Sequence, residues 1–145
     1  MREIKFRGKR VDNGEWVYGN LFKCEHKDSD SVYIIPFVTN GSFTINTLML
    51  NFISPCYEVD PKTVGQYTSL KDRNGKEIYE GDIVKYKDNL DPIDVHKYKG
   101  HVEYGNGSFY ITNDFMSSYR WIDYEIEVKG NIHDNPELLE GDEGE

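Results

Sequence analysis

The 145-residue sequence predicts a mainly β protein, and three observations lead to that prediction. The chain contains no alanine, the residue with the highest helix propensity. Aromatic residues make up 14% of the chain, and with Val, Ile and Thr they suit the half-buried surface of a pleated sheet. Asn-Gly pairs, which favour tight hairpin turns, occur at 13–14, 40–41, 74–75 and 106–107. We therefore predict a meander of hairpins that forms a small, partly open SH3-like barrel.

The first, second and fourth Asn-Gly pairs each lie between β-type segments. The predicted hairpins join residues 1–22 around their turn at 12–14, residues 32–38 to 43–45, and residues 101–104 to 109–111. Pro36 lacks a backbone N–H, so its strand is expected to be an edge strand or to contain a bulge. Residues 124–129 alternate in character and are expected to form the last strand.

The central hairpin, residues 57–86, has the clearest pattern. Asn74-Gly75 is expected at its tip in a type I′ turn, which requires a positive φ at both central residues. The segment Glu80-Gly81-Asp82 interrupts the following strand, and a glycine there predicts a bulge or sharp bend like the corner of a small barrel. The segment 87–99 contains a proline and no clear period, so we expect a loop.

The C-terminal end predicts one short helix and an acidic tail. Asn135 is suited to cap the helix, Pro136 to occupy its first position and Gly141 to end it. The last nine residues carry five carboxylates and no base. We expect residues 1–139 to form a single domain and residues 140–145 to form the tail.

The chain resembles the YopX family of small proteins encoded by phages and prophages. The stretches that carry this resemblance are Arg2–Lys9, Gly14–Leu21, Val59-Asp60-Pro61, Thr63–Thr68, Asp72–Val84 and Gly130–Leu139. They span nearly the whole chain in order, whereas residues 32–52 and 87–99 match no fixed pattern. The family has no assigned activity, so the resemblance implies no catalytic residue. It does imply a bacterial host cell.

Composition restricts the partners that are expected. The formal net charge is −9, which argues against a broad phosphate-binding face but leaves room for a local basic strand. No apolar run approaches membrane-spanning length, so we expect a cytoplasmic protein without a membrane partner. Cys24 and Cys56 are expected to be free thiols in that compartment, although a disulfide between them remains an alternative.

Several polar residues are candidates for sites of chemistry, and each has a structural alternative that we favour. Glu80 and Asp82 could act as paired carboxylates, but Asp82 is expected to accept hydrogen bonds from backbone amides at the bend, and Asp72 to cap the Asn74-Gly75 turn in the same way. The segment 63–68 is expected to guide the chain into the central hairpin, since no phosphate-binding loop accompanies it.

The histidines and cysteines do not have the spacing of a metal site. Cys24, His26 and Cys56 could ligate zinc only without the usual paired spacing, and His96 and His101 lie five residues apart across the end of a predicted loop. His133, just before the C-terminal helix, is expected to make a structural hydrogen bond. We therefore predict no metal, no cofactor and no catalytic residue.

The N-terminal segment offers the best case for nucleic acid. Its cations are Arg2, Lys5, Arg7, Lys9 and Arg10, and the aromatic residues Phe6, Trp16 and Tyr18 accompany them. Single-stranded nucleic acid binds to cations beside exposed rings. The alternative, which we favour, is that Ile4, Phe6 and Trp16 form a buried face with solvated charges opposite.

Three classes of function remain open at the level of sequence. We favour a non-enzymatic phage accessory protein that binds a host or phage protein, or that assembles into a homo-oligomer through its exposed β edges. A nucleic-acid-associated small barrel that uses the basic N-terminal strand is the alternative. A hydrolase or metal enzyme that uses Glu80 and Asp82 ranks last.

Overall fold

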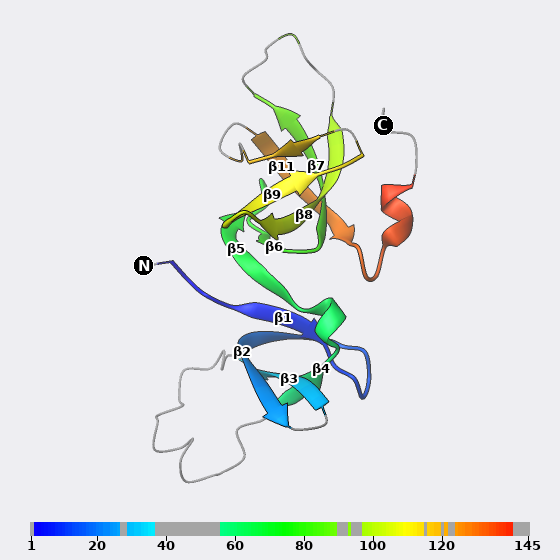
Figure 1. Cartoon of the computed structure of the whole chain (residues 1–145). Helices are drawn as coiled ribbons and strands as arrows, with labels where there is room; N and C mark the ends of the chain where they lie inside the picture. Colours follow the sequence, from blue (N-terminus) through cyan, green and yellow to red (C-terminus); the bar gives the residue numbers. More distant parts are fainter. Residues whose placement is uncertain are drawn as a thin grey trace. The chain divides into compact units, whose positions relative to one another are not determined.

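The structure is a computed structural model. It describes residues 2–26, 29–36, 56–89, 93, 97–114, 116–119, 121 and 124–140. The chain divides into two compact units, Met1–Gln66 and Tyr67–Glu145, which are described separately below (Figure 1). The prediction of a mainly β protein is confirmed, because antiparallel strands make up most of the described residues in each unit.

The first unit is a curled antiparallel sheet in the order β4-β3-β2-β1-β5. Its elements are β1 (Phe6–Lys9), β2 (Trp16–His26), β3 (Ser29–Pro36), β4 (Tyr57–Val59), the 3-10 turn η1 (Pro61–Thr63), and the first two residues of β5 (Gly65–Lys71). The predicted N-terminal hairpin is confirmed, since β1 pairs with β2 from Lys9↔Trp16 to Phe6↔Gly19. Of the segment predicted to pair around Asn40-Gly41, residues 37–50 lie outside the described residues. Pro36 ends β3, so it removes no donor from the middle of the strand.

The curl of this sheet brings the end of β1 beside β4. The amide of Val11 donates to the carbonyl of Glu58 at 3.0 Å, and the amide of Asp60 donates to the carbonyl of Lys9 at 2.8 Å. The outer edge of β4 is therefore occupied. Inside the curl lie the buried side chains of Val17, Val32, Ile34 and Val59, with Phe6 and Leu21 packed against them.

The second unit holds a five-stranded antiparallel sheet in the order β10-β9-β8-β7-β11. Its strands are β7 (Asp82–Asp88), β8 (Tyr98–Gly105), β9 (Ser108–Thr112), β10 (Ser117–Ser118) and β11 (Tyr124–Asn131), and the short strand β6 (Glu77–Tyr79) pairs with the end of β5. The last predicted strand is thus confirmed as β11. The predicted loop 87–99 is too long, because residues 87–88 belong to β7 and residues 98–99 to β8. Between these strands, residues 90–92 and 94–96 lie outside the described residues.

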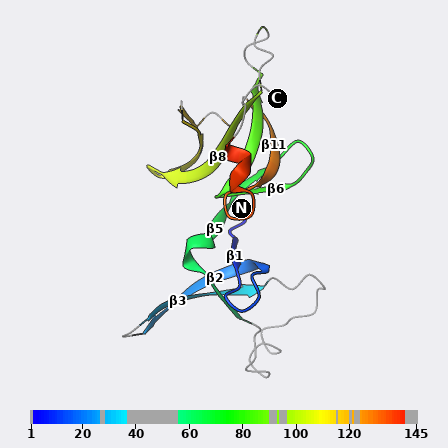
Figure 2. The same cartoon turned by 90° about the vertical axis from the view of Figure 1, so that its right-hand side faces the viewer.

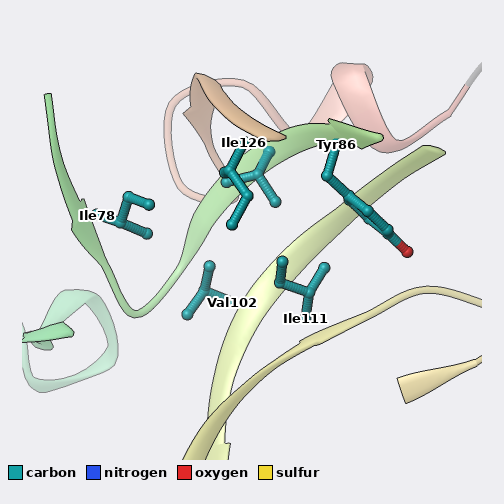
Figure 3. Close-up of a cluster of buried hydrophobic side chains, with 6 residues drawn as sticks. Ile78, Tyr86, Val102, Ile111 and Ile126 are labelled. Carbon is teal, nitrogen blue, oxygen red and sulfur yellow. The ribbon is translucent and has the colours of Figure 1, made fainter. Parts of the chain in front are cut away.

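The core of the second unit consists of buried side chains from β6, β7, β8, β9 and β11. Ile78, Tyr86, Val102, Ile111 and Ile126 point toward one another from β6, β7, β8, β9 and β11 (Figure 3). Each is at most 7% exposed, and Val84 completes the cluster. Because side chains alternate along a strand, this core leaves the intervening residues of β7, β8 and β11 on the outer face of the sheet.

The Asn-Gly pairs adopt different turns. At Asn106-Gly107 both residues have positive φ, 52° and 79°, and Gly105 pairs with Ser108, as a type I′ turn requires. At Asn74-Gly75 only Gly75 has a positive φ, 81°, so the type I′ prediction is wrong there. The chain instead makes a longer turn in which Asp72 N bonds to Lys76 O and Gly75 N to Asp72 O.

The C-terminal segment forms one short turn in place of the predicted helix. Pro136–Leu139 is a 3-10 turn, η3, and the described residues contain no α-helix. Asn135 does not cap it with its side chain, because its Oδ1 accepts from the amide of Asn131 at 3.3 Å. This turn lies beside β11 (Figure 2). A Cβ added at Gly130 would lie 3.0 Å from Leu138. The SH3-like barrel stays a prediction, since the order of the five-stranded sheet is linear.

Candidate functional site

The Glu80-Gly81-Asp82 segment is a structural bend. Gly81 has a φ of 91°, which favours glycine, and the turn connects β6 to β7. Asp82 is only 1% exposed, and its Oδ2 accepts a hydrogen bond from the amide of Tyr79 at 2.8 Å. The expectation that this carboxylate would hold backbone amides at a bend is confirmed. Its position leaves it enclosed in the fold, where Glu80 is half-buried beside it.

Asp72 caps the central turn as expected and also accepts a hydrogen bond from β11. One carboxylate oxygen accepts from the amides of Asn74 and Lys76, at 2.8 and 2.9 Å. The other accepts from the amide of Val128 in β11 at 3.0 Å. Burial raises the pKa of Asp72, but these three amides favour the charged form and leave the pKa below its usual value. Asp72 therefore joins the turn to the edge of β11.

The candidate metal ligands that the structure describes do not come together. Cys24 and Cys56 are both free thiols, and the described part of the chain holds no group of three or more His, Cys, Asp and Glu side chains that could bind a metal. The side chain of His26 and all of His96 lie outside the described residues. His133 takes part in a structural bond, because its amide donates to Asn131 Oδ1 at 3.0 Å.

The segment 63–68 guides the chain into β5, as predicted. Thr63 Oγ1 donates to the carbonyl of Asp60 at 2.7 Å and accepts from the amide of Lys9 at 2.8 Å. Thr68 Oγ1 donates to the carbonyl of Ile78 at 2.8 Å, which ties β5 to β6. Both threonines are buried, so their hydroxyls act within the fold.

The basic N-terminal strand distributes its cations over both faces of the sheet. Arg7 and Lys9 stand on the face that carries Trp16, with the guanidinium carbon 4.8 Å and the ammonium nitrogen 5.6 Å from the centre of the Trp16 ring. Arg7 is only 6% exposed. Lys5 lies 3.1 Å from Glu3, and Arg2 is exposed ahead of β1. The expected buried face is partly wrong, because Ile4 is 54% exposed and Trp16 lies on the charged side.

Arg10 turns to the opposite face and has two partners there. Its guanidinium lies 4.0 Å from the centre of the Tyr57 ring and binds both carboxylate oxygens of Asp12, at 2.6 and 2.9 Å. The hydrogen bonds between the two groups raise the pKa of Arg10 and lower the pKa of Asp12. The five basic residues predicted as one nucleic-acid site therefore do not form one contiguous surface.

A polar chain on the outer face of the second unit was not predicted from the sequence. Glu103 accepts from the hydroxyl of Tyr110 at 2.8 Å, and its other oxygen lies 2.8 Å from His101 Nε2. The pKa of Glu103 is lowered, most strongly by its hydrogen bond with His101 and next by its hydrogen bond with Tyr110. The same hydrogen bond with Glu103 raises the pKa of Tyr110. Alternation along β8 places His101 and Glu103 on one face, a signal that the predicted strand at 101–104 already contained.

A depression of about 490 Å³ opens between the central turn and β11 in the same unit. Its walls are mostly apolar, and its rim carries charge. The lining residues include Leu70, Ile78, Trp121, Tyr124, Ile126 and, at the rim, Arg73 and Glu125. Arg73 and Glu125 form an ion pair at 2.9 Å. Leu70 is 42% exposed, so an apolar group entering from solvent would meet it directly. We call this feature the apolar depression.

These features define a small all-β protein built from two antiparallel sheets. The chain belongs to the YopX family, whose model, described as YopX protein, matches residues 5–140. It is 32% identical over 111 residues to the SPbeta prophage-derived uncharacterized protein YopX of Bacillus subtilis (strain 168), covering 71% of this chain and 79% of that protein. The resemblance inferred from the sequence motifs is confirmed.

A solved structure also resembles the chain. The crystal structure of protein EF1440 from Enterococcus faecalis is 26% identical to it, with a TM-score of 0.54. The match covers 97% of this chain and all of that one, so the likeness includes both units. Among the described residues, no helix is long and apolar enough to cross a membrane.

Proposed function

We propose that the chain is a prophage-encoded accessory protein that acts by binding a host or phage protein in the bacterial cytoplasm, not by catalysis. The prophage origin is carried over from the Bacillus subtilis relative. The candidate carboxylates support a non-catalytic role, because Asp72 and Asp82 accept hydrogen bonds from the backbone of their own unit. The expected SH3-like character of the fold belongs to the same proposal, since small barrels commonly serve as binding modules.

The apolar depression is the observation that carries this proposal. Sites that bind other molecules are concave and mainly apolar, with a few polar groups that fix orientation. Trp121 is held in the wall by a hydrogen bond from its indole nitrogen to the carbonyl of Phe109 at 2.9 Å. Tyr124 is held by a 2.6 Å hydrogen bond with Ser118. With both rings fixed, the depression is formed in advance for an apolar side chain of a protein partner.

The test is a capture experiment from host cells that carry the prophage, with matched variants. Leu70→Asp places a charge at the mouth of the depression, whereas Ile93→Asp changes an 88% exposed residue that does not line it. A partner captured by the wild type and by Ile93→Asp but lost with Leu70→Asp supports the proposal. Equal capture by all three proteins, or no specific partner for the wild type, contradicts it.

The second binding function that we propose is self-association of the chain. We predicted a homo-oligomer because exposed strand edges can pair between copies of the chain. Two edges are less exposed than this prediction assumed: Lys9 and Val11 make backbone hydrogen bonds beside β4, and Asp72 and Arg73 make hydrogen bonds to β11. Light scattering of the wild type and of Leu70→Asp tests whether the chain self-associates through the apolar depression. A wild-type oligomer that becomes monomeric in the variant assigns the depression to self-assembly.

A nucleic-acid role for the N-terminal strand is favoured by one observation, the pairing of Arg7 and Lys9 with the ring of Trp16. Cations beside an aromatic ring are the elements that bind single strands. Light scattering with a short oligonucleotide at low and moderate salt tests this alternative. A complex that dissociates as salt rises and is lost in Lys5→Gln/Lys9→Gln supports it, and a scattering mass unchanged by the oligonucleotide contradicts it.

A further inference from the structure

Lysines face one another across two strands on the outer face of the second unit. Lys85 in β7 pairs directly with Lys99 in β8. Next to this pair, Tyr86 pairs with Tyr98. Lys87 follows Tyr86 in β7, and Lys97 comes directly before Tyr98, the first residue of β8. Like charges placed directly opposite each other destabilise a sheet. Two successive rows of lysines on neighbouring strands therefore need an explanation beyond a solvated face.

The nearby carboxylates form their ion pairs with other cations. Across β11, Lys85 pairs with Glu127 and Lys87 with Glu125, so each glutamate is well placed to bind its lysine. Each binds another cation instead: Glu125 lies 2.9 Å from Arg73, and Glu127 lies 2.8 Å from Lys129. The ion pair with Lys129, with further attraction from Arg73 and Lys97, lowers the pKa of Glu127.

The lysines therefore remain available to a ligand. Among the residues that the structure describes, neither Lys85, Lys87, Lys97 nor Lys99 has a carboxylate within ion-pair distance. A depression of about 250 Å³, lined by Arg73, Lys85, Lys87, Lys97, Glu125 and Glu127, lies in this region. Lys85, Lys87 and Lys97, with Arg73, outnumber the two glutamates that line the same depression, which has a formal charge of +2 on a chain of net charge −9. Lys99 lines a neighbouring depression with Glu103 and Asp114. We call the four lysines Lys85, Lys87, Lys97 and Lys99 the lysine ladder.

We propose that the lysine ladder binds the phosphate backbone of a nucleic acid. The two rows are separated by two residues along a strand, about 6.6 Å, so they match a ligand with regularly repeated charges better than a single anion. Tyr86, the aromatic residue in the lining, is only 2% exposed, so the site contacts the backbone and no bases stack on it. Binding is therefore independent of sequence and strongly dependent on salt.

This site is separate from the N-terminal strand and from the protein-binding role proposed above. Arg73 and Glu125 line both the apolar depression and the depression beside the lysine ladder, so a change at either residue would disturb both features. Lys85 and Lys87 do not line the apolar depression. Replacing these two lysines therefore tests the ladder while leaving the apolar depression and the first unit unchanged.

The experiment measures fluorescence anisotropy of labelled DNA of about 20 nucleotides, single-stranded and duplex, as salt rises from about 50 to about 200 mM. The full-length wild type is compared with Lys85→Gln/Lys87→Gln. We expect the variant to bind about tenfold more weakly, and the slope of log affinity against log salt for duplex to fall by about 1.8, since each lost phosphate contact contributes about 0.9.

Two further variants make the result specific. Lys85→Arg/Lys87→Arg keeps the charge and is expected to keep the wild-type affinity. Lys23→Gln/Lys62→Gln removes the same charge from exposed positions of the first unit outside both candidate sites and is expected to leave the salt slope unchanged. Wild-type protein that fails to bind either DNA at about 50 mM salt overturns the proposal. The proposal is also overturned if Lys23→Gln/Lys62→Gln loses as much affinity for DNA as Lys85→Gln/Lys87→Gln. Thermal melting confirms that each variant is folded.

Discussion

The two units treat their cations in opposite ways. In the first unit, Arg7 and Lys9 lie over the ring of Trp16, and Arg10 lies over Tyr57 and binds Asp12. In the second unit, Lys85 and Lys99 face each other, and neither forms an ion pair with a carboxylate of the described residues. An aromatic ring and a carboxylate each stabilise a cation within the fold. This difference agrees with a structural use of the basic residues in the first unit and with the ligand site that we propose for the lysines of the second.

The two units also differ in how they use buried carboxylates. In the second, Asp72 and Asp82 accept bonds from backbone amides, and Asp72 reaches a strand 56 residues further along the chain. In the first, the buried charged group among the described residues is the guanidinium side chain of Arg7. Buried polar groups are retained where they are hydrogen-bonded, so the second unit depends on a few carboxylates for its integrity. The predictions below test this comparison from the largest expected effect to the smallest.

The largest effect is expected from opening a cavity in one core. Ile34 and Ile111 are both 0% exposed, and they lie in the separate cores of the first and second units. Replacing either by alanine is expected to lower the free energy of unfolding by about 2 to 5 kcal/mol. The chain has two tryptophans, one in each unit, so denaturation followed by fluorescence in Trp16→Phe and Trp121→Phe backgrounds reports on the units separately.

We expect each alanine variant to move the transition of its own unit more than that of the other. Ile111→Ala should shift the Trp121 signal and leave the Trp16 signal nearly in place, and Ile34→Ala should do the reverse. Coincident shifts of both signals for both variants would contradict the comparison. They would show that the two cores unfold as one cooperative body.

The next effect is expected at Asp72. Asp72→Ala removes the acceptor of three backbone amides, so we expect a loss of about 2 to 4 kcal/mol, because hydrogen bonds to charged groups are strong and their donors are left unpaired. Chemical denaturation followed by Trp121 fluorescence measures it. Asp12→Ala, which removes a 60% exposed carboxylate from the first unit, is the matched control and should change little.

The Asp72 contribution should also depend on pH, with a definite sign. The folded pKa of Asp72 lies below its unfolded value, so this stabilisation is complete above an unfolded pKa of about 3.9. It is lost as the pH falls through the folded pKa. The stability of Asp72→Asn should therefore fall less steeply with acid than that of the wild type, measured as urea midpoints between about pH 6 and pH 3. Parallel pH profiles for the two proteins would assign the acid sensitivity to other groups.

A smaller effect is expected where a glycine allows close packing in the first unit. A Cβ at Gly8 would lie 3.0 Å from Val59, a core residue that is 1% exposed. Gly8→Ala should lower the free energy of unfolding by about 1 to 3 kcal/mol, since overpacking forces neighbours to shift. Gly8→Ala combined with Val59→Ala should recover part of this loss in a double-mutant cycle. Strictly additive losses would mean that the contact with Val59 is not the cause.

Much of the fold followed from local patterns, and the failures have a common cause. Alternation and turn residues predicted the N-terminal hairpin, β11, the bend at Gly81 and the hairpin that turns at Asn106-Gly107. The turn at Asn74-Gly75 was wrong because the side chain of Asp72 takes two amides of the turn and a third from β11. A contact between residues 72 and 128 has no local signal in the sequence.

The sites show the same limit. Asp82 was interpreted correctly because its partner, the amide of Tyr79, lies three residues away. The five N-terminal cations were grouped by proximity in sequence, but strand alternation separates Arg10 from Arg7 and Lys9. The lysine ladder combines residues from β7 and β8, and only the register of these strands shows that Lys85 faces Lys99. Pairing between strands therefore decides which charges meet, and a single sequence does not supply it.

The smallest effect tests the contrast between the cations themselves, because the sign differs between the two units. Lys9→Gln removes an ammonium 5.6 Å from the Trp16 ring, so we expect a loss of about 0.5 to 1 kcal/mol. Lys85→Gln removes one of two facing like charges, so we expect a gain of about 0.2 to 1 kcal/mol. Urea denaturation at low salt measures both, and added salt should reduce the gain by screening the repulsion. A loss of stability in Lys85→Gln would show that this lysine, like Lys9, serves the fold, and the comparison between the units would no longer hold.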